Sequence, residues 1–272
     1  MSWRLPAFCV SLALLGAVTT AVLWSGPEAE ITLTELPVPP FPPRITEGSA
    51  YETCLGTLAN DPFSAVTLAE TWQAGDGGEG AQHCLGLALI AVGKPADGAA
   101  VLEHLSQQST APPMARATVL GQAAQARLMI AQADMAAVDA SMALRLSPED
   151  TELFIMLGTA EGMRGRFKEA VDDVTAALRL ESRRTDALVL RAVMQRKLNQ
   201  LDLAQADLAQ ALTLNPNDAD ALLERGILRQ RMGDSAGARS DWEHARGVDP
   251  NTTTADLAEQ NLSLLEAGPQ RQ

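Results

Sequence analysis

Apolar and polar positions in the second half of the chain repeat at an interval of 34 residues. The stretch ALRLSPEDTELFIMLG, beginning at Ala143, is followed by ALRLESRRTDALVLRA and then by ALTLNPNDADALLERG. Within each copy the apolar residues recur every three or four positions, with one interruption in the middle and one at the end. This spacing predicts two amphipathic helices and two turns per copy.

Small residues occupy fixed places in the four copies that run from Ala117 to Thr252. Antiparallel helices approach to about 8–9 Å only where small side chains meet, so these places predict the contact between the two helices of a copy. The first helix carries Ala124, Gly158, Ala192 and Gly226. The second carries Ala136, Ala170, Ala204 and Ala238, and then Ala143, Ala177, Ala211 and Ala245.

The ends of the predicted helices are marked as well. The turn inside each copy is expected at Ala131, Gly165, Asn199 and Gly233, and each copy closes at Pro148, Ser182, Pro216 and Pro250. Large apolar residues fill the remaining core positions: Leu120, Phe154, Leu188 and Leu222 on first helices, and Leu144, Leu178 and Leu212 on second helices. One helical pair leaves an apolar face uncovered, so successive pairs must stack into a continuous core.

These residues at this period resemble the tetratricopeptide repeat, although the aromatic positions of that family are reduced here to Phe154, Phe167 and Trp242. The resemblance implies an all-α solenoid of about six helix-turn-helix hairpins and a C-terminal capping helix. Two early hairpins are irregular: Cys54–Trp72 turns at Asn60-Asp61-Pro62, and Cys84–Leu105 has Gly86 and Gly93 as its small and turn residues. About four residues, PPMA, are inserted before the regular copies.

The chain therefore divides, by prediction, into a leader, a linker and a solenoid. The expected parts are an N-terminal signal-anchor or signal peptide at 1–25, a Pro-rich linker at 26–48 and a solenoid at 49–268, with irregular hairpins at 49–112, regular repeats at 117–150, 151–184, 185–218 and 219–252, and a capping helix at 253–268. The cap is expected to start at Thr253 with Asp256, to bury Leu257, Leu262 and Leu265, and to stop at Gly268-Pro269.

The N-terminus carries twenty uncharged residues, Leu5–Trp24, which is about the length that crosses a bilayer core. Arg4 precedes them and acidic residues follow, which places the N-terminus in the cytoplasm and the remainder outside it. A cleaved signal peptide is the alternative, and both stay open. We expect a bacterial protein with a single pass through the inner membrane and its C-terminal domain in the periplasm, or one secreted to the periplasm after cleavage.

Composition and charge limit the function. The net charge of −13 argues against a nucleic-acid partner. His83, His104 and His244 have no partners at metal-ligand spacing and are expected at the surface or at helix ends, and the carboxylate pair Asp172-Asp173 is expected on a solvated face. No catalytic arrangement, metal site or cofactor site is found, so an enzyme is not expected.

Cys54 and Cys84 are a disulfide candidate, because an exported protein folds in an oxidising compartment. Equivalent residues on equivalent helices of a regular stack do not face each other, which argues against a bond. The short first hairpin could rotate its helix enough to bring the two residues together. Two buried, unbonded cysteines remain the alternative.

The resemblance also implies a groove along the exposed side of the first helices, suited to a segment of another protein. The groove positions carried over from the family are Gln125, Leu128 and Met129; Ile155, Thr159 and Met163; Val189, Val193, Arg196 and Lys197; and Leu223, Ile227, Gln230 and Arg231. The early positions are apolar and the later ones add cations, which suits an acidic partner segment with apolar residues. Alternatively, these and the neighbouring Arg191, Arg225 and Arg229 are solvated or pair with local acids.

The carboxylate clamp that some tetratricopeptide proteins use for chaperone tails is not expected. Ile155, Val189 and Leu223 stand where its lysine would be needed, and Thr159, Val193 and Ile227 replace its asparagine. The sequence thus predicts a non-catalytic protein–protein interaction scaffold of the bacterial cell envelope. The alternative is a permanently packed, non-catalytic subunit of an envelope enzyme or assembly complex, in cytochrome maturation, secretion or outer-membrane and cell-wall biogenesis.

Overall fold

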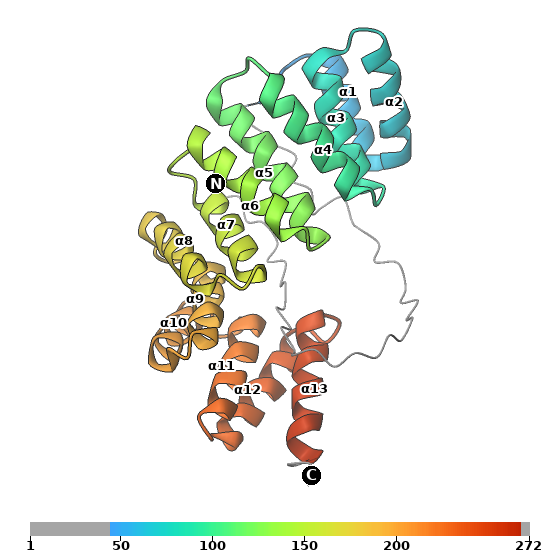
Figure 1. The fold of residues 1–272 in the computed structure, drawn as a ribbon. Helices are drawn as coiled ribbons and strands as arrows, with labels where there is room; N and C mark the ends of the chain where they lie inside the picture. Colours follow the sequence, from blue (N-terminus) through green and yellow to red (C-terminus); the bar gives the residue numbers. More distant parts are fainter. Residues whose placement is uncertain (1–43, 268–272) are drawn as a thin grey trace. The chain divides into compact units, whose positions relative to one another are not determined.

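The computed structural model of the protein describes residues 44–267, and these residues form thirteen α-helices and no strand (Figure 1). An all-α helical repeat is therefore confirmed for this part of the chain. No helix in the described range is long and apolar enough to cross a membrane. The predicted leader, most of the predicted linker and the predicted stop at Gly268-Pro269 lie outside the described residues.

The helices follow one another with short connections. Their bounds are α1 (Ser49–Asn60), α2 (Pro62–Ala74), α3 (Gly78–Ala91), α4 (Pro95–Gln108), α5 (Pro113–Met129), α6 (Ala133–Leu146), α7 (Thr151–Met163), α8 (Phe167–Leu180), α9 (Thr185–Lys197), α10 (Leu201–Leu214), α11 (Ala219–Arg231), α12 (Ser235–Val248) and α13 (Thr253–Ala267). They belong to two compact units, and the boundary between the units falls within α7, after Ala160. Unit 1 contains α1 to α6 and most of α7, and unit 2 contains the end of α7 and α8 to α13.

The turn inside each regular hairpin is built by one residue with a left-handed backbone, as the period predicts. Ala131, Gly165, Asn199 and Gly233 have φ values of 57°, 76°, 61° and 88°, and Gly93 of the irregular hairpin has 83°. Only glycine adopts this conformation without a steric cost, and asparagine tolerates it better than most residues. Ala131 is therefore the position where the repeat carries a local strain.

The four inserted residues lengthen a helix instead of forming a loop. Helix α5 has 17 residues, whereas α7, α9 and α11 have 13 each, and the extra turn begins at Pro113. Proline is well suited to the first turn of a helix, because its missing N–H has no partner to lose there. The four inserted residues, which shift the repeat register, therefore form the additional first turn of α5.

The alanines of the second helices are the contact points that the sequence predicts. All eight of them have 0% exposed area: Ala136, Ala143, Ala170, Ala177, Ala204, Ala211, Ala238 and Ala245. The first-helix glycine Gly226 lies under the indole of Trp242, so a methyl group at position 226 would overlap that ring. Close helix approach at small residues is therefore confirmed.

The large apolar residues follow the prediction with two exceptions. Leu120, Leu188 and Leu222 are each 1% exposed, but Phe154 at the same repeat position is only half-buried. Leu144 is also half-buried. The residue before Phe154, Leu153, is 3% exposed, and its equivalents Val119, Ala187 and Ala221 are also buried, so the core includes a second position that the sequence analysis did not name.

The capping helix α13 starts at Thr253, and its first turn is satisfied by the residue before it. The hydroxyl of Thr252 accepts a hydrogen bond from the N–H of Ala255 at 3.2 Å, so Thr252 caps the helix where Thr253 was expected. Leu262 is buried, while Leu257 and Leu265 are half-buried. The helix therefore covers the end of the array with a shallower apolar face than predicted.

Candidate partner-binding site

The predicted groove positions of unit 1 are half-buried. Gln125, Leu128 and Met129 on α5, and Ile155 and Thr159 on α7, all keep part of their surface. The Thr159 hydroxyl donates to the Ile155 carbonyl at 2.8 Å, and the Gln125 Oε1 is buried without a hydrogen-bond partner among the described residues. These side chains present mainly apolar atoms, which suits contact with apolar groups of a partner.

The predicted groove positions of unit 2 separate into buried and accessible ones. Val189 and Val193 on α9 are 8% exposed and Leu223 on α11 is 4% exposed, so these three belong to the core and offer little surface. Met163 and Ile227 are half-buried. The prediction that all of them line an accessible surface is wrong for the three buried residues. Val193, for example, belongs to a core cluster with Ala170 of the preceding second helix α8.

Arg196 and Arg231 brace α9 and α11 against each other. Arg196 on α9 donates to the carboxylate of Glu224 on α11 at 3.1 and 2.9 Å. Arg231 on α11 donates in return to the Arg196 carbonyl at 3.2 Å and to the Asn199 side chain at 2.9 Å. Both arginines therefore already hold the structure together.

Lys197 lies between these two arginines. Its pKa is lowered, mainly because the ammonium group is partly buried and also because Arg196 and Arg231 repel it, while Glu224 opposes the shift. We call Arg196, Lys197 and Arg231 the cationic cluster. Glu224 pairs with Arg196 of this cluster, and Arg231 and its neighbour Gln230 are exposed.

The other arginines predicted to crowd the first helices pair with buried carboxylates of the second helices. Arg191 makes two bonds to Asp207, at 2.8 and 2.7 Å. Arg225 and Arg229 both bond to Asp241, each at 2.7 Å in their shortest contacts. These three arginines therefore pair with local acids, which is one of the two alternatives that the sequence left open. They are already engaged within the fold, so we do not include them in the partner-binding site.

Asp173 corrects the prediction of a solvated carboxylate pair. Asp172 is exposed, but Asp173 is half-buried on α8, and burial raises its pKa to about 6, with repulsion from Glu161, Asp172 and Glu169 adding to the shift. The aspartates at the same repeat position, 34 residues apart, are the ion-paired Asp207 and Asp241. Aligning the copies could have revealed this position, since an arginine precedes each of those two by 16 residues.

Two connections join α1 to α3 in unit 1. Cys54 and Cys84 form a disulfide with a Cα–Cα distance of 6.2 Å, and both residues are fully buried. One turn away on α1, the Tyr51 hydroxyl lies 2.5 Å from the His83 Nδ1, and the His83 Nε2 lies 2.7 Å from the Gln122 Oε1 on α5. Three successive first helices are therefore linked by side chains.

His83 is 1% exposed, so its expected place at the surface or at a helix end is wrong. Because the amide oxygen of Gln122 can only accept, the Nε2 of His83 must donate, and the neutral ring then accepts from Tyr51 at Nδ1. Burial lowers the pKa of His83 to about 4, against a smaller opposing effect of the Gln122 hydrogen bond. The ring is therefore a structural, neutral histidine.

Comparison with known proteins identifies the fold of this chain but not its partner or its cellular setting. No protein-family model matches the sequence, and no curated protein matches it. Among solved structures, PilF of Pseudomonas aeruginosa is similar with a TM-score of 0.60 and 15% identity, covering 78% of this chain and 96% of that one. A thermophilic TPR protein of Thermus thermophilus gives a TM-score of 0.54 and 20% identity, covering 70% of this chain and 99% of that one.

A third structure, YrrB, is described as a TPR protein with an unusual peptide-binding site, and it matches with a TM-score of 0.50 and 18% identity over 78% of this chain and 98% of its own. The chain has the tetratricopeptide-repeat fold.

Proposed function

We propose that the protein is a non-catalytic interaction scaffold that binds an acidic segment of a partner protein at the cationic cluster, with apolar contacts from the first helices beside it. The gathering of three cations, Arg196, Lys197 and Arg231, on the neighbouring helices α9 and α11 carries this proposal. The ammonium group of Lys197 is partly buried, and repulsion from Arg196 and Arg231 contributes to its lowered pKa. A partner carboxylate beside Lys197 would relieve that repulsion, and charge-assisted hydrogen bonds of this kind are the stronger ones.

The setting belongs to the same proposal: a bacterial inner-membrane protein whose described part lies in the periplasm. The buried disulfide between Cys54 and Cys84 supports it, because such bonds persist in oxidising compartments and are rare in the cytosol. The uncharged stretch Leu5–Trp24 supports a membrane anchor or an export signal. Fractionation of cells that express the tagged full-length protein, with protease applied from the periplasmic side, tests both points.

The partner site is tested by a photo-crosslinking amino acid placed at Ile227, which is half-buried on α11 near the cationic cluster. The matched control places it at Leu203, which is 54% exposed on the second helix α10. We expect a discrete adduct from position 227 that position 203 does not give. An identical adduct pattern from both positions would refute a site on the first helices.

The charge contribution is tested by Lys197→Glu, because Arg196 and Arg231 brace the helices and their replacement would also destabilise the fold. Lys168→Glu is the matched control, since Lys168 is exposed on α8 and the charge change is the same. We expect Lys197→Glu to remove most of the adduct formed at position 227 and Lys168→Glu to leave it. Equal recovery from both variants would show that the partner is not held by charge at Lys197.

Permanent packing into an envelope complex is the second candidate. It predicts that the full-length protein is recovered only together with other subunits, whereas a scaffold that captures a segment is recovered alone. Size-exclusion chromatography after mild detergent extraction separates the two.

A further inference from the structure

The connection between α8 and α9 departs from the other copies at one residue. Proline stands at the second position after α6, α10 and α12, as Pro148, Pro216 and Pro250, but Ser182 stands there after α8. Glu181 before it has φ −132° and ψ 85°. The residues before the three prolines, Ser147, Asn215 and Asp249, have similar angles, with φ between −138° and −148° and ψ between 81° and 98°. The residue before Ser182 therefore has a backbone that the other copies combine with a following proline.

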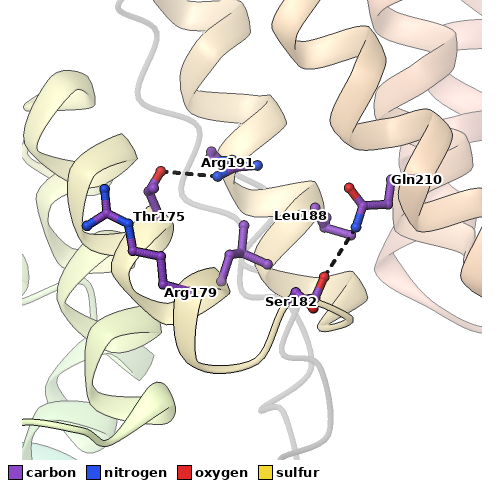
Figure 2. Close-up of a pocket in the computed structure, with 7 residues that line it drawn as sticks. Thr175, Arg179, Ser182, Leu188, Arg191 and Gln210 are labelled. Atoms are coloured by element: carbon purple, nitrogen blue, oxygen red, sulfur yellow. Dashed lines mark hydrogen bonds between the residues drawn. The ribbon is translucent and has the colours of Figure 1, made fainter.

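A small surface cavity of about 170 Å³, largely open to solvent, lies at this connection within unit 2 (Figure 2). Two hydrogen bonds hold its walls: Gln210 Nε2 donates to the Ser182 carbonyl at 3.2 Å, and Arg191 Nη1 donates to the Thr175 hydroxyl at 3.2 Å. Arg191 is fixed from behind by its two bonds to Asp207. The lining consists of Thr175, Leu178 and Arg179 from α8, Ser182 from the connection, Leu188 and Arg191 from α9, and Gln210 from α10.

Four arginines, Arg179, Arg183, Arg184 and Arg191, lie at or next to the cavity, and two of them are paired with carboxylates. Arg184 is engaged by Asp186 at 2.6 Å and by Glu181 at 3.8 Å. Arg179 and Arg183 are exposed, and neither has an ion pair within residues 44–267. In Figure 2 the Arg179 guanidinium lies beside Thr175, at the side away from Arg191. As a long exposed side chain, Arg179 can turn toward the cavity mouth when an anion arrives.

We infer that this cavity receives one carboxylate side chain of an acidic protein segment, with Arg179 as its counter-ion. The hydroxyls of Thr175 and Ser182 are the neutral donors, and Leu178 and Leu188 form the apolar wall around the methylene groups. Its volume is well below the roughly 300 Å³ at which cofactor and drug-sized pockets begin, so a single side chain fits and a larger ligand does not. The inference rests on the proposed function and gives the partner a second anchor, outside the predicted groove.

The cavity is tested with the full-length protein and a fluorescently labelled hexaglutamate peptide, followed by fluorescence anisotropy at physiological ionic strength. Ser182→Pro fills the cavity and changes no charge; the Ser182 N–H has no hydrogen bond to lose within the described residues, and the carbonyl that Gln210 uses is retained. Arg179→Gln removes the counter-ion. Arg145→Gln is the matched control, because Arg145 holds the same repeat position one copy earlier, in front of Pro148.

We expect saturable binding that Ser182→Pro and Arg179→Gln each weaken by about tenfold, the size of one lost charge-assisted hydrogen bond, and that Arg145→Gln changes by less than about twofold. Equal affinity of all four proteins, with unchanged circular dichroism, overturns the inference. So does binding of inorganic phosphate alone that depends on Ser182 while the peptide does not bind, since the occupant would then be a free anion.

Lys197→Glu is measured in parallel and separates this inference from the proposed function. Loss of binding in Lys197→Glu alone leaves the cationic cluster as the site and removes the cavity. Loss in Ser182→Pro and Arg179→Gln alone keeps the cavity and removes the cluster. Loss in all three variants supports both anchors on one partner.

Discussion

Acidification should destabilise unit 1 through His83, and the size of the effect follows from its buried contacts. The neutral ring accepts from Tyr51 and donates to Gln122, and Arg44, whose guanidinium lies 6.0 Å from the Tyr51 ring centroid, also disfavours a second positive charge. Protonation would put an N–H at Nδ1, so the Tyr51 hydroxyl would have to turn and accept a hydrogen bond there instead of donating one. Unfolding exposes the imidazole and restores its ordinary proton affinity.

The sign and magnitude follow from linkage between protonation and folding. The folded pKa of about 4 lies below the unfolded value of 6.5, so the unfolded chain binds more protons and stability falls as the pH drops below 6.5. Between about pH 7.5 and about pH 5 the loss is about 2 kcal/mol, and the full shift corresponds to about 3.4 kcal/mol at 1.36 kcal/mol per unit. Above about pH 7.5 the ring is almost entirely neutral in both states and contributes almost no pH dependence.

Asp139 in the same unit changes the unfolding free energy with pH in the opposite direction. Measurements on the wild type alone would therefore give the sum of the two effects and not the effect of His83. Burial raises its pKa to about 7, despite Arg127 at 2.8 Å, and this carboxylate favours folding as the pH falls. The His83→Gln variant keeps a hydrogen-bonding side chain that does not titrate and leaves Asp139 unchanged. Comparing wild type with His83→Gln at both pH values therefore isolates the histidine.

Hydrogen exchange measured by mass spectrometry on α3 peptides of the full-length protein gives the opening free energy of unit 1. We expect wild type to lose about 2 kcal/mol relative to His83→Gln on going from about pH 7.5 to about pH 5. His104→Gln is the control, because His104 is exposed on α4, and it should track the wild type. A difference between wild type and His83→Gln that stays constant within about 0.5 kcal/mol would refute the buried neutral histidine.

Three further changes act on covalent, backbone and packing features. Replacing Cys54 and Cys84 together by alanine should lower the unfolding free energy by about 3–4 kcal/mol in urea titrations, because the bond closes a loop with a separation of 30 residues. Ala131→Gly should raise it by about 0.5–1 kcal/mol and increase the melting temperature, since the residue has φ 57°. Gly226→Ala should lower it by about 1–3 kcal/mol and shift the emission of Trp242, whose indole the new methyl group would overlap.

The two glycine predictions have matched controls in the chain. Gly165 occupies the same turn position as Ala131 at φ 76°, so Gly165→Ala should cost about 1 kcal/mol or more. Gly247 lies on α12 with no atom within 4 Å of an added methyl group, so Gly247→Ala should stabilise the helix by about 0.5–1 kcal/mol. A stabilising Gly165→Ala, or a Gly226→Ala variant as stable as Gly247→Ala, would contradict the backbone and packing arguments respectively. A loss below about 1 kcal/mol without the disulfide would contradict the loop-closure argument.

The repeated features of the fold could be predicted because the same residue pattern occurs in every copy. A left-handed turn and two alanine contacts recur at one period, and helix geometry leaves few other structures for that pattern. The burial of Val189 and Leu223 could not be predicted in this way, since the family register marks a position on the first helix and not what packs over it. His83 was missed because its partners lie 32 and 39 residues away, at separations that do not match the 34-residue period.

Differences between copies are more informative about function than the repeat itself. Asp139, Asp207 and Asp241 each have an arginine, but at the positions that would supply one to Asp173 the chain carries Leu157 and Glu161. The same copy also lacks the closing proline. The missing arginines would lie on α7, but the carboxylate they would pair with, Asp173, lies on α8, and Ser182 follows α8 directly. Each loss gives up stabilisation that neighbouring copies retain, since an arginine partner offsets the burial of a carboxylate and a proline restricts the unfolded chain. Local departures of this kind are expected at binding sites, so the end of α8 and the cavity beside it are the first places to mutate.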